Sequence, residues 1–121
     1  MAVGGEAMMI ARGMTPAHRH LRSRLTLLLA ATVALAVSEA TTNVVVHAYR
    51  DRDEPGTFTL GLDIECGSLM IDVCDDGLGP APRTDSPGLG LGLPLIAQMT
   101  DGFEVHEADT GGTEVRMRFA L

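Results

Sequence analysis

Residues 38–49, SEATTNVVVHAY, carry three polar side chains at helical spacing within a stretch that is rich in Ala and Val. Glu39, Asn43 and His47 stand at i, i+4 and i+8, so a helix over this segment presents them on one face. The apolar residues around them predict that the helix is buried. Because a buried polar stripe is costly unless it meets a ligand or a metal, this spacing indicates a binding site on a core helix.

The apolar run 25–37, LTLLLAATVALAV, follows several arginines and resembles the charged and hydrophobic regions of a signal peptide. Its thirteen residues are fewer than the ~20 that a membrane-spanning helix needs. Cleavage after the run would also separate the helix carrying Glu39 from its own first turns. We therefore expect two consecutive helical pieces, residues 18–29 and 30–49, that cover a sheet in a cytoplasmic protein without a membrane segment.

Alternating apolar residues predict four strands in two hairpins. The first hairpin comprises residues 57–65 and 68–74, and the second comprises residues 103–108 and 113–121. The side chains expected to face the core are Phe58, Leu60, Leu62 and Ile64 in the first strand, Leu69, Ile71 and Val73 in the second, and Val115, Met117, Phe119 and Leu121 in the last.

Two glycine-rich motifs follow the first hairpin. Asp75-Asp76-Gly77-Leu78-Gly79 begins where a buried strand ends, and Gly88, Gly90 and Gly92 precede a short predicted helix over residues 93–99. Glycines before a helix N-terminus offer free amides and a positive dipole end to phosphate. No GKT or GKS follows them, which excludes an ordinary P-loop. Residues 80–87 have the composition of a loop.

This order of elements predicts a two-layer α/β sandwich, with helices on one face of a mixed, mostly antiparallel sheet. A chain of 121 residues is long enough for one such domain. Its formal net charge of −7 argues against direct nucleic-acid binding, which depends on basic residues. Cys66 and Cys74 form no CxxC pair and are interpreted as two reduced thiols rather than zinc ligands.

Taken in order, the polar helix, the D-x-G-x-G motif and the second glycine motif resemble the three boxes of the GHKL ATPase superfamily. The resemblance covers the chain from about Leu25 to its C-terminus and implies the Bergerat ATP-binding fold, with ATP and Mg²⁺ as cofactors. It implies a GHKL ATP-binding domain over residues 21–121. Residues 1–20 are then an N-terminal extension.

The same resemblance implies how the nucleotide is recognised. Asp75 accepts a hydrogen bond from the exocyclic amine of adenine, while Gly77 and Gly79 let the backbone approach the base. Thr113, after a Gly-Gly pair, matches a late element that hydrogen-bonds near the adenine. As alternatives from the residues alone, Asp75 begins a turn and Thr113 is an ordinary strand residue.

A second group of residues is implied to handle the phosphates and the reaction. Asn43 coordinates Mg²⁺ through its side-chain oxygen, and Glu39 acts as the general base. His47 supports either Asn43 or the phosphates, with a hydrogen-bonded structural histidine as the equal alternative. Residues 80–87 match the lid that closes over the triphosphate in this family. The remaining nucleotide-binding residues implied are Gly88, Gly90 and Gly92 of the phosphate loop, Leu93 directly after it, and Arg83 of the lid, for which an exposed, solvated arginine is the alternative.

Among the branches of the superfamily, the small anti-sigma-factor serine/threonine kinases are the most similar. The sequence has no phosphoacceptor box of a histidine kinase at the expected place and no transducer domain of a gyrase, Hsp90 or MutL protein. The resemblance implies an enzyme that sequesters a sigma factor in one state. In another state it phosphorylates a serine on a STAS-domain anti-sigma factor antagonist, and homodimers are usual in this branch.

Two other functions remain open from the sequence. The chain is alternatively a binding-only anti-sigma module that holds nucleotide without phosphotransfer. It is otherwise a stand-alone ATPase domain that serves a histidine-kinase-like pathway in trans. Each of these shares the nucleotide site and differs in where, or whether, the phosphoryl group is transferred.

Overall fold

The computed structural model describes residues 15–80 and 92–121. In chain order the elements are α2 (Pro16–Asn43), the π-helical segment η1 (Val44–Ala48), β1 (Phe58–Glu65), β2 (Ser68–Asp75), α3 (Gly92–Met99), β3 (Gly102–Glu107) and β4 (Thr113–Ala120). The chain divides within α2 into two compact units, residues 1–32 and 33–121. The second unit contains the sheet, α3 and the polar helix segment, so it contains the candidate site.

The prediction of two helical pieces is wrong, because α2 is one continuous helix that passes directly into η1. No Gly or Pro occurs between residues 17 and 48, so nothing in the sequence interrupts the helix. Pro16 occupies the first turn, where its missing amide donor costs nothing. The change to π geometry follows Asn43 directly, and such π segments often occur at functional sites.

In the first unit, the described residues are helical from Pro16 onward and largely exposed. Hydroxyl groups of Ser23, Thr26 and Thr32 donate to the carbonyl oxygens four residues earlier. The helical stretch Pro16–Ala48, at 33 residues, is long and apolar enough to cross a membrane by length and composition alone. The predicted thirteen-residue run is thus part of a longer helix, but signal sequences and core helices of soluble proteins meet the same criterion.

The sheet has the strand order β1-β2-β4-β3, and its three pairings are all antiparallel. A two-residue turn joins β1 to β2, with Glu65 paired to Ser68. Both turn residues have positive φ, 48° at Cys66 and 73° at Gly67, as a two-residue hairpin turn of type I′ requires. The predicted two-layer α/β fold and both predicted hairpins are confirmed, with antiparallel rather than mixed pairing among the described strands.

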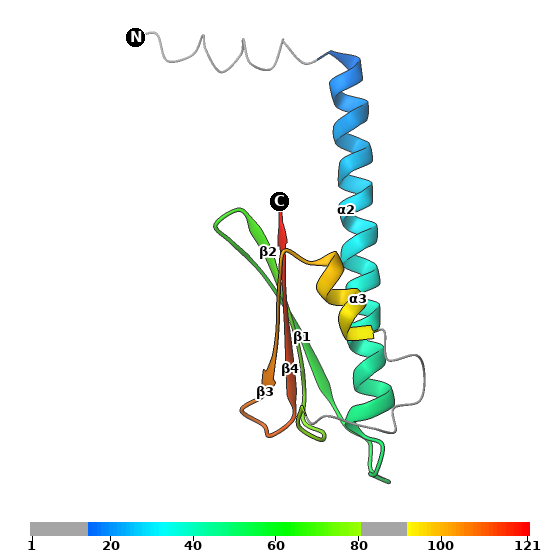
Figure 1. Cartoon of the computed structure of the whole chain (residues 1–121), viewed down its shortest axis with the longest axis vertical. Helices are drawn as coiled ribbons and strands as arrows, with labels where there is room; N and C mark the ends of the chain where they lie inside the picture. Colours follow the sequence, from blue (N-terminus) through cyan, green and yellow to red (C-terminus); the bar gives the residue numbers. More distant parts are fainter. Residues whose placement is uncertain (1–14, 81–91) are drawn as a thin grey trace. The chain divides into compact units, whose positions relative to one another are not determined.

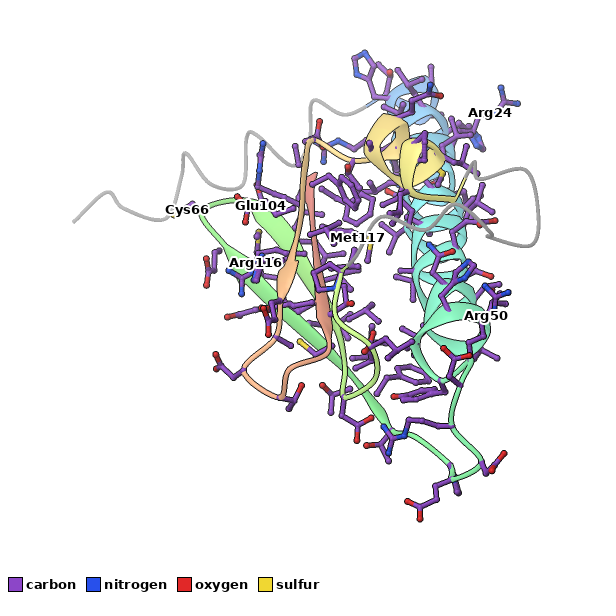
Figure 2. The ribbon with its side chains drawn as sticks, turned by 60° about the horizontal axis from the view of Figure 1, so that its bottom comes forward. Arg24, Arg50, Cys66, Glu104, Arg116 and Met117 are labelled. Carbon is purple, nitrogen blue, oxygen red and sulfur yellow. The ribbon has the colours of Figure 1, made fainter. Side chains whose placement is uncertain are left out.

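The core of the second unit lies between one face of the sheet and the helices (Figure 1). The helix contributes small residues four apart, and Met117 points from β4 toward the helices, whereas Arg116 and Glu104 point away from them (Figure 2). The buried apolar residues are Ala36, Ala40, Val44, Ala48, Ile71, Val73, Ile96, Ala108, Val115, Met117 and Phe119.

Strand β1 departs from the predicted burial. Every residue of β1 is exposed, and the four apolar side chains expected in the core retain 43 to 67% of their accessible surface. These side chains are Phe58, Leu60, Leu62 and Ile64. Because β1 is an edge strand, it has a neighbour on one side only. Leu121, also predicted to face inward, is 63% exposed because it follows the end of β4.

Candidate functional site

The polar stripe of the helix lies at the rim of the core rather than within it. Glu39, Asn43 and His47 are each half-buried and directly precede the buried residues Ala40, Val44 and Ala48. Neighbouring positions on a helix differ by about 100°, so one strip of the helix packs on the sheet while the next strip borders it. The predicted spacing on one face is retained, at a depth where a ligand has access.

Asn43 faces the beginning of α3. A Cβ atom added to Gly92 would lie 3.0 Å from Asn43 Oδ1 and 3.2 Å from Nδ2, so the carboxamide lies directly against the backbone there. The Nδ2 atom is buried and has no hydrogen-bond partner in the described part of the chain. A buried, unsatisfied amide is uncommon and costly, which favours a ligand at this position.

Asp75, the last residue of β2, is a buried carboxylate with only 5% of its surface exposed. Its Oδ1 atom accepts backbone amide hydrogens from Gly77 at 3.0 Å and from Thr113 at 3.1 Å. Its Oδ2 atom makes no hydrogen bond with any residue that the structure describes. Among the described residues, Asp75 therefore has one oxygen held by two backbone amides and a second oxygen without a hydrogen bond.

The segment after Asp75 is packed against the end of η1. The Leu78 amide donates to the Ala48 carbonyl at 2.9 Å, and a Cβ on Gly77 would lie 2.2 Å from that carbonyl oxygen. Gly77 is therefore required for close contact between the loop and the helix. The restriction at Gly79 is weaker, because a Cβ there would lie 3.3 Å from the nearest atom, Gly111 O.

The turn before β4 brings Thr113 next to Asp75 and Leu78. Thr113 donates its amide to Asp75 Oδ1 and its hydroxyl to the Leu78 carbonyl, the latter at 3.3 Å. Thr110 donates its hydroxyl to the Asp75 carbonyl at 2.9 Å. Sequence reasoning missed Thr110 and Gly112, although the Gly-Gly pair next to Thr113 was the available signal. A Cβ on Gly112 would lie only 2.1 Å from Asp75 O.

Of the other predicted site residues, the structure describes some and not others. Glu39 lies one helical turn before Asn43 and makes no hydrogen bond or ion pair with the described residues. Leu93 follows Gly92 in the first turn of α3 and is 41% exposed. Arg83, Gly88, Gly90 and all but the first residue of the predicted loop over residues 80–87 lie outside the described residues.

The chemistry of these groups fits a nucleotide with its metal. No cluster of three or more His, Cys, Asp or Glu side chains able to hold a metal occurs among residues 15–80 and 92–121. A divalent cation would therefore rely on the Asn43 oxygen together with oxygens of the ligand and water, which is how proteins commonly hold Mg²⁺. The Asp75 carboxylate at the end of β2 and the Asn43 carboxamide at the end of α2 belong to separate elements of one unit.

Comparison with known proteins identifies the family of the chain. The family model described as a histidine kinase-like ATPase domain matches residues 7–119. Among individual relatives, an anti-sigma F factor of Clostridium botulinum (strain Eklund 17B / Type B) is 32% identical over 97 residues, covering 71% of this chain and 67% of the relative. An anti-sigma F factor of Clostridium acetobutylicum is 31% identical over 102 residues, with coverages of 74% and 70%.

Solved structures show the same fold. The histidine kinase domain from the blue-light activated histidine kinase EL346 of Erythrobacter litoralis matches with a TM-score of 0.62 and 31% identity. This match covers 77% of the chain but only 45% of the kinase-domain chain, so the two proteins share a part and not their full length. The family match over residues 7–119 and these relatives show that the chain belongs to the histidine kinase-like ATPase domain family.

Proposed function

We propose that this chain is an ATP-binding anti-sigma regulator with protein serine/threonine kinase activity. Its substrate is a STAS-domain anti-sigma factor antagonist, and in another state it sequesters a sigma factor. The family assignment supports ATP binding, and the relatives named anti-sigma F factor support the regulatory role. The observation that carries the nucleotide site is the pair formed by Asp75, with one oxygen available, and Asn43, with a buried, unsatisfied amide.

In this proposal the two ends of the site bind different parts of ATP. Asp75 Oδ2 accepts a hydrogen bond from the exocyclic amine of adenine, while Gly77 and Thr113 hold Oδ1. The free amides at the start of α3, next to Gly92, face the phosphates. Asn43 Oδ1 would hold Mg²⁺, which would offset the negative charge of the phosphates.

Glu39 is the proposed general base for the transfer. Its carboxylate accepts the proton of the acceptor serine hydroxyl while the serine oxygen bonds to the γ-phosphorus. The bond to the bridging oxygen breaks at the same time, and ADP leaves. Glu39 suits this role because it is half-buried, lies one turn from Asn43 and is not engaged by the described residues.

Transfer from labelled ATP to STAS-domain proteins of the same genome tests this function. We expect an acid-stable phosphoserine or phosphothreonine, and a Glu39→Gln variant that binds ATP near the wild-type affinity but transfers about 10² to 10⁴ times more slowly. Glu65→Gln, at the exposed end of β1, is the matched control. Wild-type transfer by Glu39→Gln would remove the catalytic role of Glu39.

The same assay separates the two alternative functions. Sigma-factor binding without any transfer to a STAS protein would favour the binding-only module, and an acid-labile phosphohistidine would favour the histidine-kinase-like pathway. We place the protein in the cytoplasm, with no nucleic acid or membrane partner, and expect it to form a homodimer. Sedimentation of the purified protein with and without ATP tests the dimer.

A further inference from the structure

A second cluster of contacts lies beside Asp75, around the next residue, Asp76. The Tyr49 hydroxyl lies within hydrogen-bond distance of two acceptors, Asp76 Oδ1 at 2.9 Å and the Thr57 carbonyl oxygen. The Thr57 amide donates to the same Asp76 oxygen at 3.3 Å. Three segments therefore meet at this point: the residue after η1, the residue before β1 and the residue after Asp75.

Arg52 completes the cluster. Its Nη1 atom donates to the Asp76 carbonyl at 3.2 Å and lies 3.8 Å from Asp76 Oδ1, while its guanidinium carbon lies 5.6 Å from the centroid of the Tyr49 ring. That distance is within the range of a cation–π contact. We call Tyr49, Arg52, Thr57 and Asp76 the Tyr49–Asp76 clamp.

The ring of Tyr49 has little freedom to move. A Cβ atom on Gly56 would lie 1.9 Å from Cε1 and 2.3 Å from Cδ1 of the ring, so the backbone passes the ring at a distance that only glycine permits. Burial, followed by the hydrogen bond with Asp76, raises the pKa of Tyr49. The same hydrogen bond lowers the pKa of Asp76, so a neutral donor meets a charged acceptor at neutral pH.

The clamp is joined to Asp75 by a single peptide bond, because Asp76 directly follows Asp75. Asp75 and Asp76 are neighbours, one buried and one exposed, and Leu78 is bonded to Ala48, the residue before Tyr49. Asp76 is solvent-exposed, and exposed ion pairs add little to stability. The contacts of the clamp therefore hold the residue that directly follows Asp75.

We propose that Tyr49 and Asp76 are positioning residues that aim Asp75 Oδ2 at the exocyclic amine of adenine, and that they thereby set the preference for adenine over bases with a carbonyl at that position. This inference rests on the proposed ATP site. Without the clamp, the loop after β2 remains attached through the Asp75 hydrogen bonds and the Leu78–Ala48 bond, but Asp75 is less well oriented.

The test compares ATP with ITP, which carries a carbonyl in place of the adenine amine. We expect wild-type protein to bind ATP at least about tenfold more tightly than ITP in calorimetry with Mg²⁺, the effect of one charge-assisted hydrogen bond. Tyr49→Phe keeps the ring beside Gly56 and removes only the hydroxyl. We expect it to lower the ATP-to-ITP preference about three- to tenfold, with the ITP affinity nearly unchanged.

Asp76→Ala should give the same loss of preference, and the double variant should lose no more than either single variant, because the pair acts as one unit. Asp63→Ala, which removes an exposed carboxylate of β1, is the control and should keep the wild-type preference.

Equal losses of ATP and ITP affinity in Tyr49→Phe would mean a merely structural role and overturn the inference. Equal binding of ATP and ITP by the wild type would overturn the proposed adenine site itself, and the clamp with it.

A second measurement needs no variant, because Tyr49 is the only tyrosine and the chain has no tryptophan. Phenolate absorbance therefore titrates Tyr49 alone. If the clamp and the base are coupled, linkage requires that saturating ATP raise the pKa of Tyr49 more than saturating ITP does. Identical titration curves with ATP and ITP would overturn the inference.

Discussion

The carboxamide of Asn43 lies against the backbone of Gly92, where an added Cβ would come within 3.0 Å of Oδ1 and 3.2 Å of Nδ2. The contact joins the polar helix to the last glycine of the second motif, two segments that are far apart in the sequence. It makes Gly92 a sensitive position, because a side chain there meets the proposed metal ligand directly.

Gly92→Ala should weaken Mg²⁺-dependent ATP binding while the protein stays folded. The added methyl requires Asn43 to shift by a few tenths of an ångström, and overpacking of this kind costs about 1 to 3 kcal/mol, or about 5- to 150-fold in affinity. Calorimetry with and without Mg²⁺ measures the effect. Gly61→Ala is the control, because a Cβ there has ordinary contact with Asp72 at 3.8 Å. Equal affinities in the two variants would contradict the assignment.

Asn43→Ala should abolish the Mg²⁺ dependence of ATP binding with little effect on the protein without ligand. The side chain holds a buried Nδ2 with no partner among the described residues, and a group of this kind costs about 1 to 3 kcal/mol in the folded state. Its removal offsets the lost packing, so the free energy of unfolding should change by no more than about 1 kcal/mol. A large drop in Tm without ligand would identify Asn43 as a structural amide instead.

Asp75→Asn should reduce ATP affinity by about 1.5 to 3 kcal/mol, or about 10- to 150-fold. The remaining carbonyl oxygen can still accept the Gly77 and Thr113 amides, so the amide group is left where the adenine amine needs an acceptor. ITP affinity should fall less than ATP affinity. Asp72→Asn, on the outer face of the sheet, is the matched control. Unchanged ATP affinity in a folded Asp75→Asn protein would remove the adenine assignment.

The pH dependence of stability should report on Tyr49 at the alkaline end. Burial and the Asp76 hydrogen bond raise the pKa of Tyr49 above the usual 10.0. A raised folded-state pKa contributes stability that is fully present below about pH 10 and is lost as the pH rises through the folded value. Urea denaturation at a series of pH values should show this loss in the wild type. An alkaline loss of the same size in Tyr49→Phe would mean that another group is responsible.

At the acidic end, the hydrogen bond from Tyr49 lowers the pKa of Asp76 below 3.8. The sign is opposite, because a lowered carboxyl pKa contributes stability above about pH 3.8 that is lost as the pH falls through the folded value. In the same urea denaturation series, Asp76→Asn should therefore lose less unfolding free energy than the wild type as the pH falls below about 3.8. The same loss of unfolding free energy at acidic pH in Asp76→Asn and in the wild type would contradict the lowered pKa of Asp76.

The two free thiols should differ in reactivity. Burial, followed by the charge of Glu114, raises the pKa of Cys74, whereas Cys66 is exposed in the β1–β2 turn. Since the thiolate is the reacting form, iodoacetamide at neutral pH should modify Cys66 faster than Cys74 by about tenfold or more. Peptide mass spectrometry over a time course measures both rates. Faster modification of Cys74 would contradict this order.

Much of the fold follows from local patterns in the sequence. The two hairpins, the short helix after Gly92 and the strand that ends at Asp75 were predicted within about two residues of their positions. Alternation with period two and the Gly-containing turns are properties of neighbouring residues, so the sequence alone specifies them. The inward positions Ile71, Val73 and Val115 follow from the same alternation.

Other features depend on distant segments. The exposure of Leu60 and Leu62 is decided by the position of β1 at the sheet edge, which no local pattern reveals. The continuity of α2 was missed because its long apolar run resembles two shorter helices. The depth of the polar stripe likewise depends on which strip of the helix packs on the sheet.

For the site, the sequence alone determined which residues were candidates: a polar stripe on a helix and two glycine motifs at fixed spacings. Only the tertiary structure decided which of their atoms meet. It places Asn43 against Gly92, holds Asp75 Oδ1 with amides of Gly77 and Thr113, and connects Tyr49 to Asp76. The physical reason is that hydrogen bonding and close backbone contact are set by distances between segments far apart in the chain, which residue spacing does not specify.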